Sequence, residues 1–336
     1  MVDLESIGSM LQLDDAATIE ERPVMTNTDN GQAPEQPPTP GPEIRPTEQG
    51  ERIIRTNEVD LCVQTFGNRA DPPILLIMGG GSSMDWWEEG FCERLVAGSR
   101  FVLRYDHRDT GRSVSYEPGA PQYTLRDLTT DAVGVLDAFA LESAHLVGMS
   151  MGGCIAQLAA LDHPDRVASL TLISTSPTAG QSDPDLQERS DELDQAPFGD
   201  EEAPKPDWSD RGAVIDYIVE GERSVAGSLP FDEAAKREIA ARIFDRTANL
   251  ASSMTNHYIM DAGDRWREQL GEIGAPTLVV HGTEDPMYPY GNAVALEKEI
   301  PGARLLTLER VGHEMPPRAL WDVVVPAILR HTWSAP

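Results

Sequence analysis

Residues 144–153 read AHLVGMSMGG, and this stretch decides the fold. A short apolar run typical of a buried strand ends in glycines around Ser150, and a helix-like stretch follows over 151–162. In this G-x-S-x-G pattern, Gly148 and Gly152 relieve the crowding of a turn that larger side chains would not fit. The turn exposes the serine hydroxyl at a helix N-terminus, where amides favour developing negative charge. We therefore predict that Ser150 is a nucleophile; the alternative is an ordinary glycine-rich turn.

Strand-like and helix-like stretches alternate along the chain from residue 51. Ile74–Met78 and Leu278–Val280 are short continuous apolar runs, as expected of parallel strands that are buried on both faces. The clearest helix is Thr124–Ala140, because Thr124 is a good N-cap and the apolar residues share one face. This alternation predicts an α/β fold with a mostly parallel, doubly wound sheet. The expected strands are 60–66, 74–78, 101–105, 144–147, 167–173, 277–281 and 304–308.

Two segments depart from this alternation. Residues 1–50 are acidic, and their second half is rich in proline, so we predict a disordered N-terminal extension. Our hypothesis for its role is contact with an unknown protein partner. Residues 177–262 have no strand-like run and are too long for an ordinary loop. We predict that they form a helical cap, inserted after the sixth strand of the sheet. The α/β core would then consist of 51–176 and 263–336.

Charge excludes two classes of partner. The chain of 336 residues carries 56 acidic and 27 basic residues, which gives a formal net charge of −29. Such a field repels nucleic acids and anionic membranes, so we expect neither as a partner. The acidity has two interpretations, an ordinary acidic soluble protein or a surface adapted to high salt. Only three of the basic residues are lysines, which fits the second interpretation but also codon bias.

The cysteines and the N-terminus bear on cofactors and location. Cys62, Cys92 and Cys154 are odd in number and widely separated, so they indicate neither a disulfide framework nor a metal site. We expect reduced thiols and no cofactor or metal. The acidic N-terminus lacks the sustained apolar stretch of a secretory signal, and no later stretch is apolar and long enough for a membrane span. The prediction is a cytoplasmic protein.

A serine hydroxyl is a poor nucleophile unless a base accepts its proton and an acid orients the base. Among seven histidines, we choose His313 in VGHEMP, because it comes just after the last strand and Gly312 gives its backbone freedom. The preceding strand ends in HGTEDP, which offers two acids. We prefer Asp285 to Glu284 because Asp285 precedes a proline, which favours an extended turn and a fixed carboxylate. The alternative for all of them is a solvated surface loop.

The same chemistry requires two donors for a developing oxyanion. One is expected to be the backbone N–H of Met151, directly after the nucleophile. The other should come from the loop MGGGSS after the strand 74–78, and we choose Gly80, because glycine lets its amide approach a substrate closely. The alternative is a flexible turn. A phosphate-binding loop is excluded, since no G-K-[ST] follows.

Five motifs over about residues 51–333 resemble those of the α/β-hydrolase superfamily: MGGG, YDHRDTGRS, GMSMGG, HGTEDP and GHEMP. Within it, LLIMGGGSSMDWW, RYDHRDTGRS and LDHPDRVASLTLIS look most like the aclacinomycin methylesterase-like group of polyketide-tailoring esterases. The resemblance implies a cofactor-free serine hydrolase with the chain order Ser150, Asp285, His313. It also implies a hydrophobic small-molecule substrate, the methyl ester of a bulky aromatic or polyketide-like compound.

The resemblance extends to supporting residues. It implies that Asp106 and Arg108 brace the loops beneath the site. Met78 stands where the family often has histidine, and because the oxyanion donors are backbone amides, we expect the hole to persist. Trp86 and Trp87 have two interpretations: they line the acyl pocket, or they pack a helix onto the sheet, as such pairs do more often.

Rival functions remain open at this point. C–C bond hydrolases, aminopeptidases and haloperoxidase-like enzymes share the same triad. Aspartate nucleophiles characterise the epoxide hydrolases and haloalkane dehalogenases of this fold, so the serine argues against both. A non-catalytic binding protein on the same fold is the alternative from a different class, and loss of a triad residue would favour it.

Overall fold

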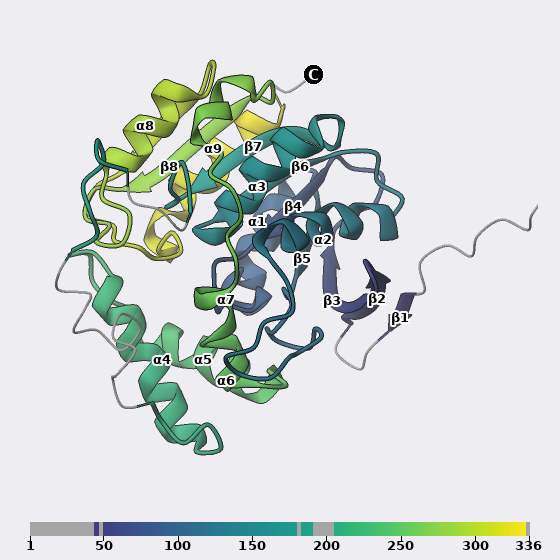
Figure 1. Ribbon diagram of the computed structural model, residues 1–336, viewed down its shortest axis with the longest axis vertical. Helices are drawn as coiled ribbons and strands as arrows, with labels where there is room; N and C mark the ends of the chain where they lie inside the picture. Colours follow the sequence, from purple (N-terminus) through teal and green to yellow (C-terminus); the bar gives the residue numbers. More distant parts are fainter. Residues whose placement is uncertain (1–43, 47–49, 180–182, 191–204, 334–336) are drawn as a thin grey trace, which may run out of the picture. The chain divides into compact units, whose positions relative to one another are not determined.

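The computed structural model describes residues 44–46, 50–179, 183–190 and 205–333, which belong to one compact unit of residues 40–336. Within these residues a nine-stranded sheet has the order β1-β2-β3-β5-β4-β6-β7-β8-β9 (Figure 1). Neighbours from β5 through β4 to β9 pair in parallel, whereas the β1–β2, β2–β3 and β3–β5 pairs are antiparallel. The predicted fold class, an α/β fold with a mostly parallel, doubly wound sheet, is confirmed. The strands are β1 Ile44–Pro46, β2 Arg52–Thr56, β3 Val59–Phe66, β4 Pro73–Ile77, β5 Phe101–Tyr105, β6 Ala144–Met149, β7 Val167–Ile173, β8 Thr277–Gly282 and β9 Arg304–Leu308.

The apolar runs form central strands because helices cover both faces of the sheet. In β4, Leu75 and Ile77 face a core that includes residues of α2, α3 and α8. The alternating Ile74 and Leu76 face a second core that includes residues of α1 and α9. Successive strand residues point to opposite faces, so a strand buried on both reads as continuously apolar. The helices are α1 Glu89–Ala97, α2 Leu125–Ala138, α3 Met151–Asp162, α8 Gly291–Glu299 and α9 Trp321–Trp333.

A local signal sets the start of α2. The predicted N-cap of α2 is confirmed: the Thr124 side chain accepts from the Asp127 N–H, and the Asp127 carboxylate accepts from the Thr124 N–H. Such a capping box satisfies two amides that have no partner inside the helix. At the C-terminal end, the short 3-10 helix Arg318–Leu320 precedes α9, and Pro326 lies inside α9.

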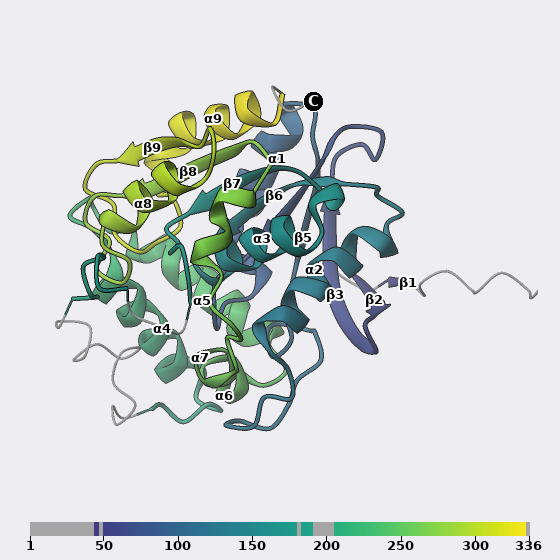
Figure 2. The ribbon, with the colours of Figure 1, turned by 45° about the horizontal axis from the view of Figure 1, so that its top comes forward.

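The described residues between β7 and β8 form four α-helices, which we call the cap helices: α4 Arg211–Val225, α5 Glu233–Arg246, α6 Leu250–Ser253 and α7 Asn256–Ile259. Figures 1 and 2 both show α4, α5 and α6 grouped together, away from the sheet. None of the nine strands falls in this described stretch. The boundaries 177–262 stay a prediction, because 180–182 and 191–204 lie outside the described residues.

The N-terminal prediction needs one correction. β1 (Ile44–Pro46) pairs with β2, although it lies in the extension 1–50 for which we predict disorder, so that prediction is wrong for these three residues. Both β1 and β2 precede the first strand that we expected, 60–66, and β7 is the seventh strand of the sheet. The cap helices therefore follow the seventh strand and not the sixth. Residues 1–43 and 47–49, including the hypothetical partner-binding tail, lie outside the described residues.

All three cysteines are buried and free. Burial raises the pKa of the Cys154 thiol to about 11, so this thiol stays protonated near neutral pH. The described residues hold no cluster of three or more histidine, cysteine or acidic side chains suited to a metal ion. In the same part of the chain, every helix is too short or too polar to cross a bilayer.

Candidate active site

Ser150 sits on a strained turn between β6 and α3. Its φ of 53° and ψ of −120° lie in a region that residues other than glycine rarely adopt. A Cβ on Gly148 would lie 2.1 Å from the Gly152 oxygen, and one on Gly152 would lie 2.2 Å from the Ile77 oxygen. Both glycines are therefore required by close backbone approach. The turn sets the Ser150 side chain at the wall of a cavity.

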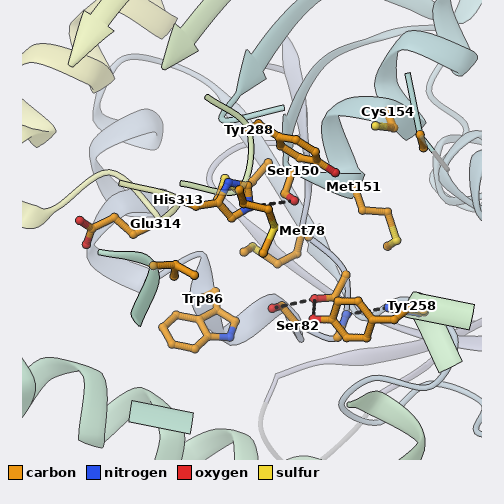
Figure 3. A pocket seen from close by; sticks show the side chains of 18 of the residues that line it. Met78, Ser82, Trp86, Ser150, Met151, Cys154, Tyr258, Tyr288, His313 and Glu314 are labelled. Atoms are coloured by element: carbon orange, nitrogen blue, oxygen red, sulfur yellow. Dashed lines mark hydrogen bonds between the residues drawn. The ribbon is translucent and has the colours of Figure 1, made fainter. Parts of the chain in front are cut away.

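His313 reaches Ser150 from the loop after β9. Its Nε2 lies 3.0 Å from Ser150 Oγ, and its Nδ1 lies 2.9 Å from Asp285 Oδ2 (Figure 3 shows the pair Ser150 and His313). An ionised carboxylate only accepts hydrogen bonds, so Nδ1 carries the proton and Nε2 presents its lone pair to the serine hydroxyl. The backbone N–H of His313 donates to Val225 O at the end of α4, so a cap helix also fixes this loop.

Asp285 is held rigidly in the loop after β8. Its Oδ1 accepts from the N–H groups of Met287 and Tyr288, at 3.0 and 2.8 Å. Burial acts to raise the pKa of this carboxyl, but the facing His313 and its hydrogen bond, with His281, bring it below the ordinary value. Asp285 therefore stays ionised next to His313 and can stabilise an imidazolium.

The alternative acid, Glu284, points elsewhere. Its carboxylate accepts from the backbone N–H and the hydroxyl of Ser228, at 2.6 and 3.0 Å. The structure thus brings Ser150, Asp285 and His313 together and leaves Glu284 on an exposed contact.

The remaining histidines bond to partners other than Ser150. Their partners are Met78 O for His107, Ser169 Oγ for His145, Gly81 N and Arg108 O for His257, Tyr288 O for His281, and Leu170 O for His331, while His163 lies at the end of α3.

Gly80 and Met151 lie where the two oxyanion donors are expected. A Cβ on Gly80 would be 3.7 Å from Met151 Sδ, so the loop after β4 approaches the first turn of α3. The N–H of Met151 opens α3 and has no acceptor within the helix. In the loop, the Gly81 N–H already donates to His257 and the Ser82 N–H to Gly79 O. These two amides are thus occupied, and Gly80 stays the predicted donor of the loop.

The cavity around Ser150 has a volume of about 370 Å³, within the range of small-molecule sites. It lies between the sheet and the cap helices, because residues of α4 and α7 line it together with Ser150 and His313. Methionine is the most frequent residue type in its wall: of the eleven methionines of the chain, those that line it are Met78, Met149, Met151, Met254, Met260, Met287 and Met315. Methionine is adaptable in shape and makes favourable contacts with aromatic rings.

The tryptophan pair divides between its two interpretations. Trp86 lines the cavity (Figure 3), as the pocket interpretation expects. Trp87 does not belong to the wall: it is fully buried and packs against Phe91 with ring centroids 5.7 Å apart. The pocket interpretation is thus wrong for Trp87. Trp86 is the last residue of a short 3-10 helix, Met84–Trp86, and Trp87 follows it as the C-cap. The turn of this helix points the two neighbouring side chains in different directions.

Charged side chains stand at one side of the cavity. Glu222 of α4 pairs with Lys236 of α5 at 2.7 Å, and the Lys236 ammonium lies 5.0 Å from the centre of the Trp86 ring. Glu314 also lines the cavity; burial raises its pKa, and nearby Lys236 acts in the opposite direction. This ion pair and cation–π contact hold α4 and α5 against the wall.

Asp106 and Arg108 brace the loops beneath the site. Asp106 accepts from the backbone N–H groups of Met84 and Arg112, at 2.9 and 3.0 Å. Arg108 binds Asp131 of α2 through two hydrogen bonds of 2.7 and 2.9 Å. Both contacts fix the chain on either side of β5 without touching Ser150.

Sequence patterns did not reveal several residues that contact the site. Tyr288 stacks edge-on against His313, with ring centroids 5.3 Å apart. Ser253, His257 and Tyr258 of the α6–α7 region contact the glycine loop. None of them belongs to a motif, and only the packing of the cap helices brings them to the site.

Comparison with known proteins identifies the family. A family described as alpha/beta hydrolase fold matches residues 72–211, and one described as TAP-like protein matches 259–319. A rhodomycin D methylesterase from a Streptomyces species is 35% identical over 306 residues, which cover 84% of this chain and 98% of that protein. The chain belongs to the α/β-hydrolase family. A second rhodomycin D methylesterase, from Streptomyces peucetius, is 34% identical to this α/β-hydrolase over 84% of the chain and 98% of its own length.

Solved structures share the fold of this α/β-hydrolase. An esterase from a Rhodococcus species has a TM-score of 0.67 at 19% identity, covering 87% of this chain and 99% of its own. A 2-hydroxy-6-oxo-6-phenylhexa-2,4-dienoate hydrolase from Rhodococcus has a TM-score of 0.66 at 20% identity, covering 87% and 100%. With methylesterases as relatives over most of its length, this α/β-hydrolase is an esterase-type enzyme.

Proposed function

We propose that this α/β-hydrolase cleaves a carboxylic ester through an acyl-enzyme, with Ser150 as nucleophile. The observation that carries the proposal is the position of His313, which bonds Ser150 Oγ through one ring nitrogen and Asp285 through the other. Acyl transfer by a hydroxyl requires this arrangement, in which a base accepts the proton of the nucleophile and an acid orients the base.

In the first half of the reaction, Ser150 Oγ bonds to the ester carbonyl carbon while His313 Nε2 accepts the hydroxyl proton. The carbonyl oxygen becomes an oxyanion, and Asp285 stabilises the imidazolium. The C–O bond to the alkoxy group then breaks, and His313 returns the proton to the leaving alkoxide, which departs as the alcohol. The acyl group remains on Ser150.

In the second half, His313 accepts a proton from a water molecule as its oxygen bonds to the acyl carbon. The bond to Ser150 Oγ then breaks, the proton returns to the serine, and the carboxylic acid leaves. The Gly80 and Met151 N–H groups stabilise the oxyanion in both halves. Losing one such donor costs about 3 kcal/mol of transition-state stabilisation.

The substrate we propose is the methyl ester of a bulky aromatic or polyketide-like compound. Two features support it: the methionine-rich wall of the cavity, which suits flat aromatic surfaces, and two relatives that are named rhodomycin D methylesterases. Trp86 and Tyr258 add aromatic surface to the same wall.

The test is a hydrolysis screen with aromatic polycyclic methyl esters, simple alkyl methyl esters and aminoacyl amides. We expect release of methanol from the polycyclic esters to be fastest, and the Ser150→Ala protein to release none.

A fluorophosphonate should label the wild-type protein at Ser150, and Cys154→Ser, in the same cavity wall, serves as the matched control that keeps labelling. A folded wild-type protein that is neither labelled nor active on any ester would favour a non-catalytic binding protein. Amide turnover without ester turnover would favour an aminopeptidase.

A further inference from the structure

Three residues of the cap helix region hold the glycine loop that contains Gly80. We call residues 78–83 the oxyanion loop. The Ser253 hydroxyl donates to Gly81 O at 2.9 Å, and the Tyr258 hydroxyl donates to Gly80 O at 3.2 Å. His257 Nδ1 lies 2.8 Å from the Gly81 nitrogen. Figure 3 shows Tyr258 beside the loop, next to Ser82.

Two of these contacts act on a single peptide plane. The Gly80 carbonyl and the Gly81 N–H belong to the same planar unit. Its oxygen accepts from Tyr258 and its N–H donates to His257, so both ends of the unit are fixed from the cap side. The Gly80 N–H belongs to the preceding peptide plane, which joins this one at the Gly80 Cα. Consecutive glycines have unusual backbone freedom, so fixing one of the two planes reduces the rotations that would turn the Gly80 N–H away from a substrate.

The hydrogen bonds determine the tautomer of His257. A backbone N–H only donates, so Nδ1 must accept from Gly81, and the proton must lie on Nε2, which donates to Arg108 O at 2.8 Å. Burial lowers the pKa of this imidazole to about 4, although its bond to Arg108 acts in the opposite direction. The neutral ring therefore persists at neutral pH, where it can accept.

The start of the oxyanion loop is held from the core. His107 Nε2 donates to Met78 O at 2.9 Å, and the His107 and His257 rings lie edge to face with centroids 5.9 Å apart. His107 comes from the loop after β5, whereas His257 comes from α7. The core thus anchors the start of the loop, and the cap helix region anchors its middle.

The α7 segment is itself fixed to the core. Asn256 is fully buried, and its amide donates to Asp109 Oδ2 at 2.9 Å and to Glu117 O at 3.1 Å. His257 therefore stands on a rigid support, as a residue that positions catalytic groups requires.

We propose that His257 is a positioning residue that holds the oxyanion loop in its donor geometry, which makes the α6–α7 segment, residues 250–259, part of the apparatus that stabilises the transition state. The proposal rests on the proposed acyl-transfer function. A displacement of 1 Å in a catalytic donor can reduce the rate by about 100-fold, because the donors must face the oxyanion without reorganising. Substrate contacts with α7 would then change turnover as well as affinity.

The test compares two substitutions of His257 on a p-nitrophenyl ester. His257→Phe fills the site but can neither accept from Gly81 nor donate to Arg108, so we expect kcat to fall by 10- to 100-fold with KM changed less than threefold. His257→Gln keeps an acceptor and a donor on one amide, and it should recover part of the loss. The matched control is His331→Phe, which removes a buried histidine that donates to Leu170 O, far from the oxyanion loop; its kcat should stay within twofold.

A second measurement reads the loop without catalysis. Hydrogen exchange of the peptide that covers residues 78–83 should be at least tenfold faster in His257→Phe than in wild type, and unchanged in His331→Phe. Unchanged exchange and unchanged kcat in His257→Phe would overturn the positioning role. If the wild type hydrolyses no ester, the proposed function fails, while the exchange rates still decide whether His257 holds the loop.

A third variant covers the case in which His257→Phe does not fold. Tyr258→Phe removes only a hydroxyl from a residue that is 55% exposed, so folding should be retained. We expect a severalfold lower kcat and faster exchange over 78–83, and the absence of both would contradict the proposal.

Discussion

Asp285 lies between two histidines: its Oδ2 is 2.9 Å from His313 Nδ1 and 3.5 Å from His281 Nε2. Only His313 also reaches Ser150, whereas His281 Nε2 donates to Tyr288 O. The buried His281 Nδ1 has no hydrogen-bond partner among the described residues. Two imidazoles thus share one carboxylate, and the geometry gives them different roles.

The first prediction separates these two histidines. His313→Gln should lower kcat/KM for an ester by about 10⁴-fold, because it removes the base that Ser150 requires. His281→Gln should stay within tenfold of wild type, since its amide can still donate to Tyr288 O and it touches neither Ser150 nor the cavity. Steady-state kinetics on a p-nitrophenyl ester check both. Equal losses in the two variants would show that the pair acts as a unit.

The second prediction concerns the two acids of the HGTEDP motif. Asp285→Asn should lower kcat by about 10⁴-fold, because an amide can leave His313 in the wrong tautomer. Glu284→Gln is the matched control: it sits next in sequence, but its carboxylate contacts Ser228 and not a histidine. We expect kcat within threefold of wild type for this variant. A larger loss in Glu284→Gln than in Asp285→Asn would reassign the acid.

The sequence predicts those parts of the site that depend on local geometry. The turn at Ser150 can be recognised because its glycines are close in sequence and lie between a strand and a helix. Asp285 and His313 follow parallel strands, and the carboxyl ends of such strands meet at one edge of the sheet. Residue type and strand order are then sufficient to bring the three together.

Other features depend on packing over long distances and leave no local pattern. His257 and Tyr258 lie in the four-residue helix α7, whose position depends on bonds such as that between Asn256 and Asp109. Trp86 and Trp87 have the same chemistry, and only the fold decides which one lines the cavity. β1 is three residues long, so its pairing with β2 was hidden in a polar, proline-rich context.

The third prediction concerns Arg246, which connects the cap helix α5 to the core. Its guanidinium bonds to Glu51, Asp85 and Asp106, and its side chain is 4% exposed. Arg246→Met removes the cation of Asp106, whereas Arg112 still pairs with Glu51 and Arg242 still lies 3.7 Å from Asp85. The uncompensated buried charge should cost about 3–5 kcal/mol of unfolding free energy. Urea denaturation measures the loss.

Arg211→Met is the control for this variant. Arg211 pairs with Asp245 between α4 and α5, but the side chains are 51% and 57% exposed, so its removal should cost less than about 1 kcal/mol.

The loss of unfolding free energy in Arg246→Met should also become smaller as the pH falls from 7 to 5. Burial already raises the pKa of Asp106, and removing Arg246, which lowers it, raises it further. The folded variant then binds protons that its unfolded chain releases. A deficit independent of pH would show that lost packing, and not charge, is the cause.

The fourth prediction concerns stability in acid. Burial is the main cause that lowers the pKa of His145 to about 4, against about 6.5 for an unfolded histidine, and the nearby Arg100 and His331 act in the same direction. Between pH 6.5 and 4, His145 is therefore protonated in the unfolded chain but neutral in the folded protein. As the pH falls through this range, His145 lowers the unfolding free energy by about 1.4 kcal/mol per pH unit. His145→Gln should lack this component, so its unfolding free energy, measured by urea denaturation at pH 7, 6 and 5, should fall less steeply than that of wild type. Ser169→Ala is the matched variant, because it removes the hydroxyl 2.8 Å from His145 Nδ1 but keeps the imidazole, and it should retain the full slope. If His145→Gln and Ser169→Ala showed the same slope, the titration of His145 would not be its source.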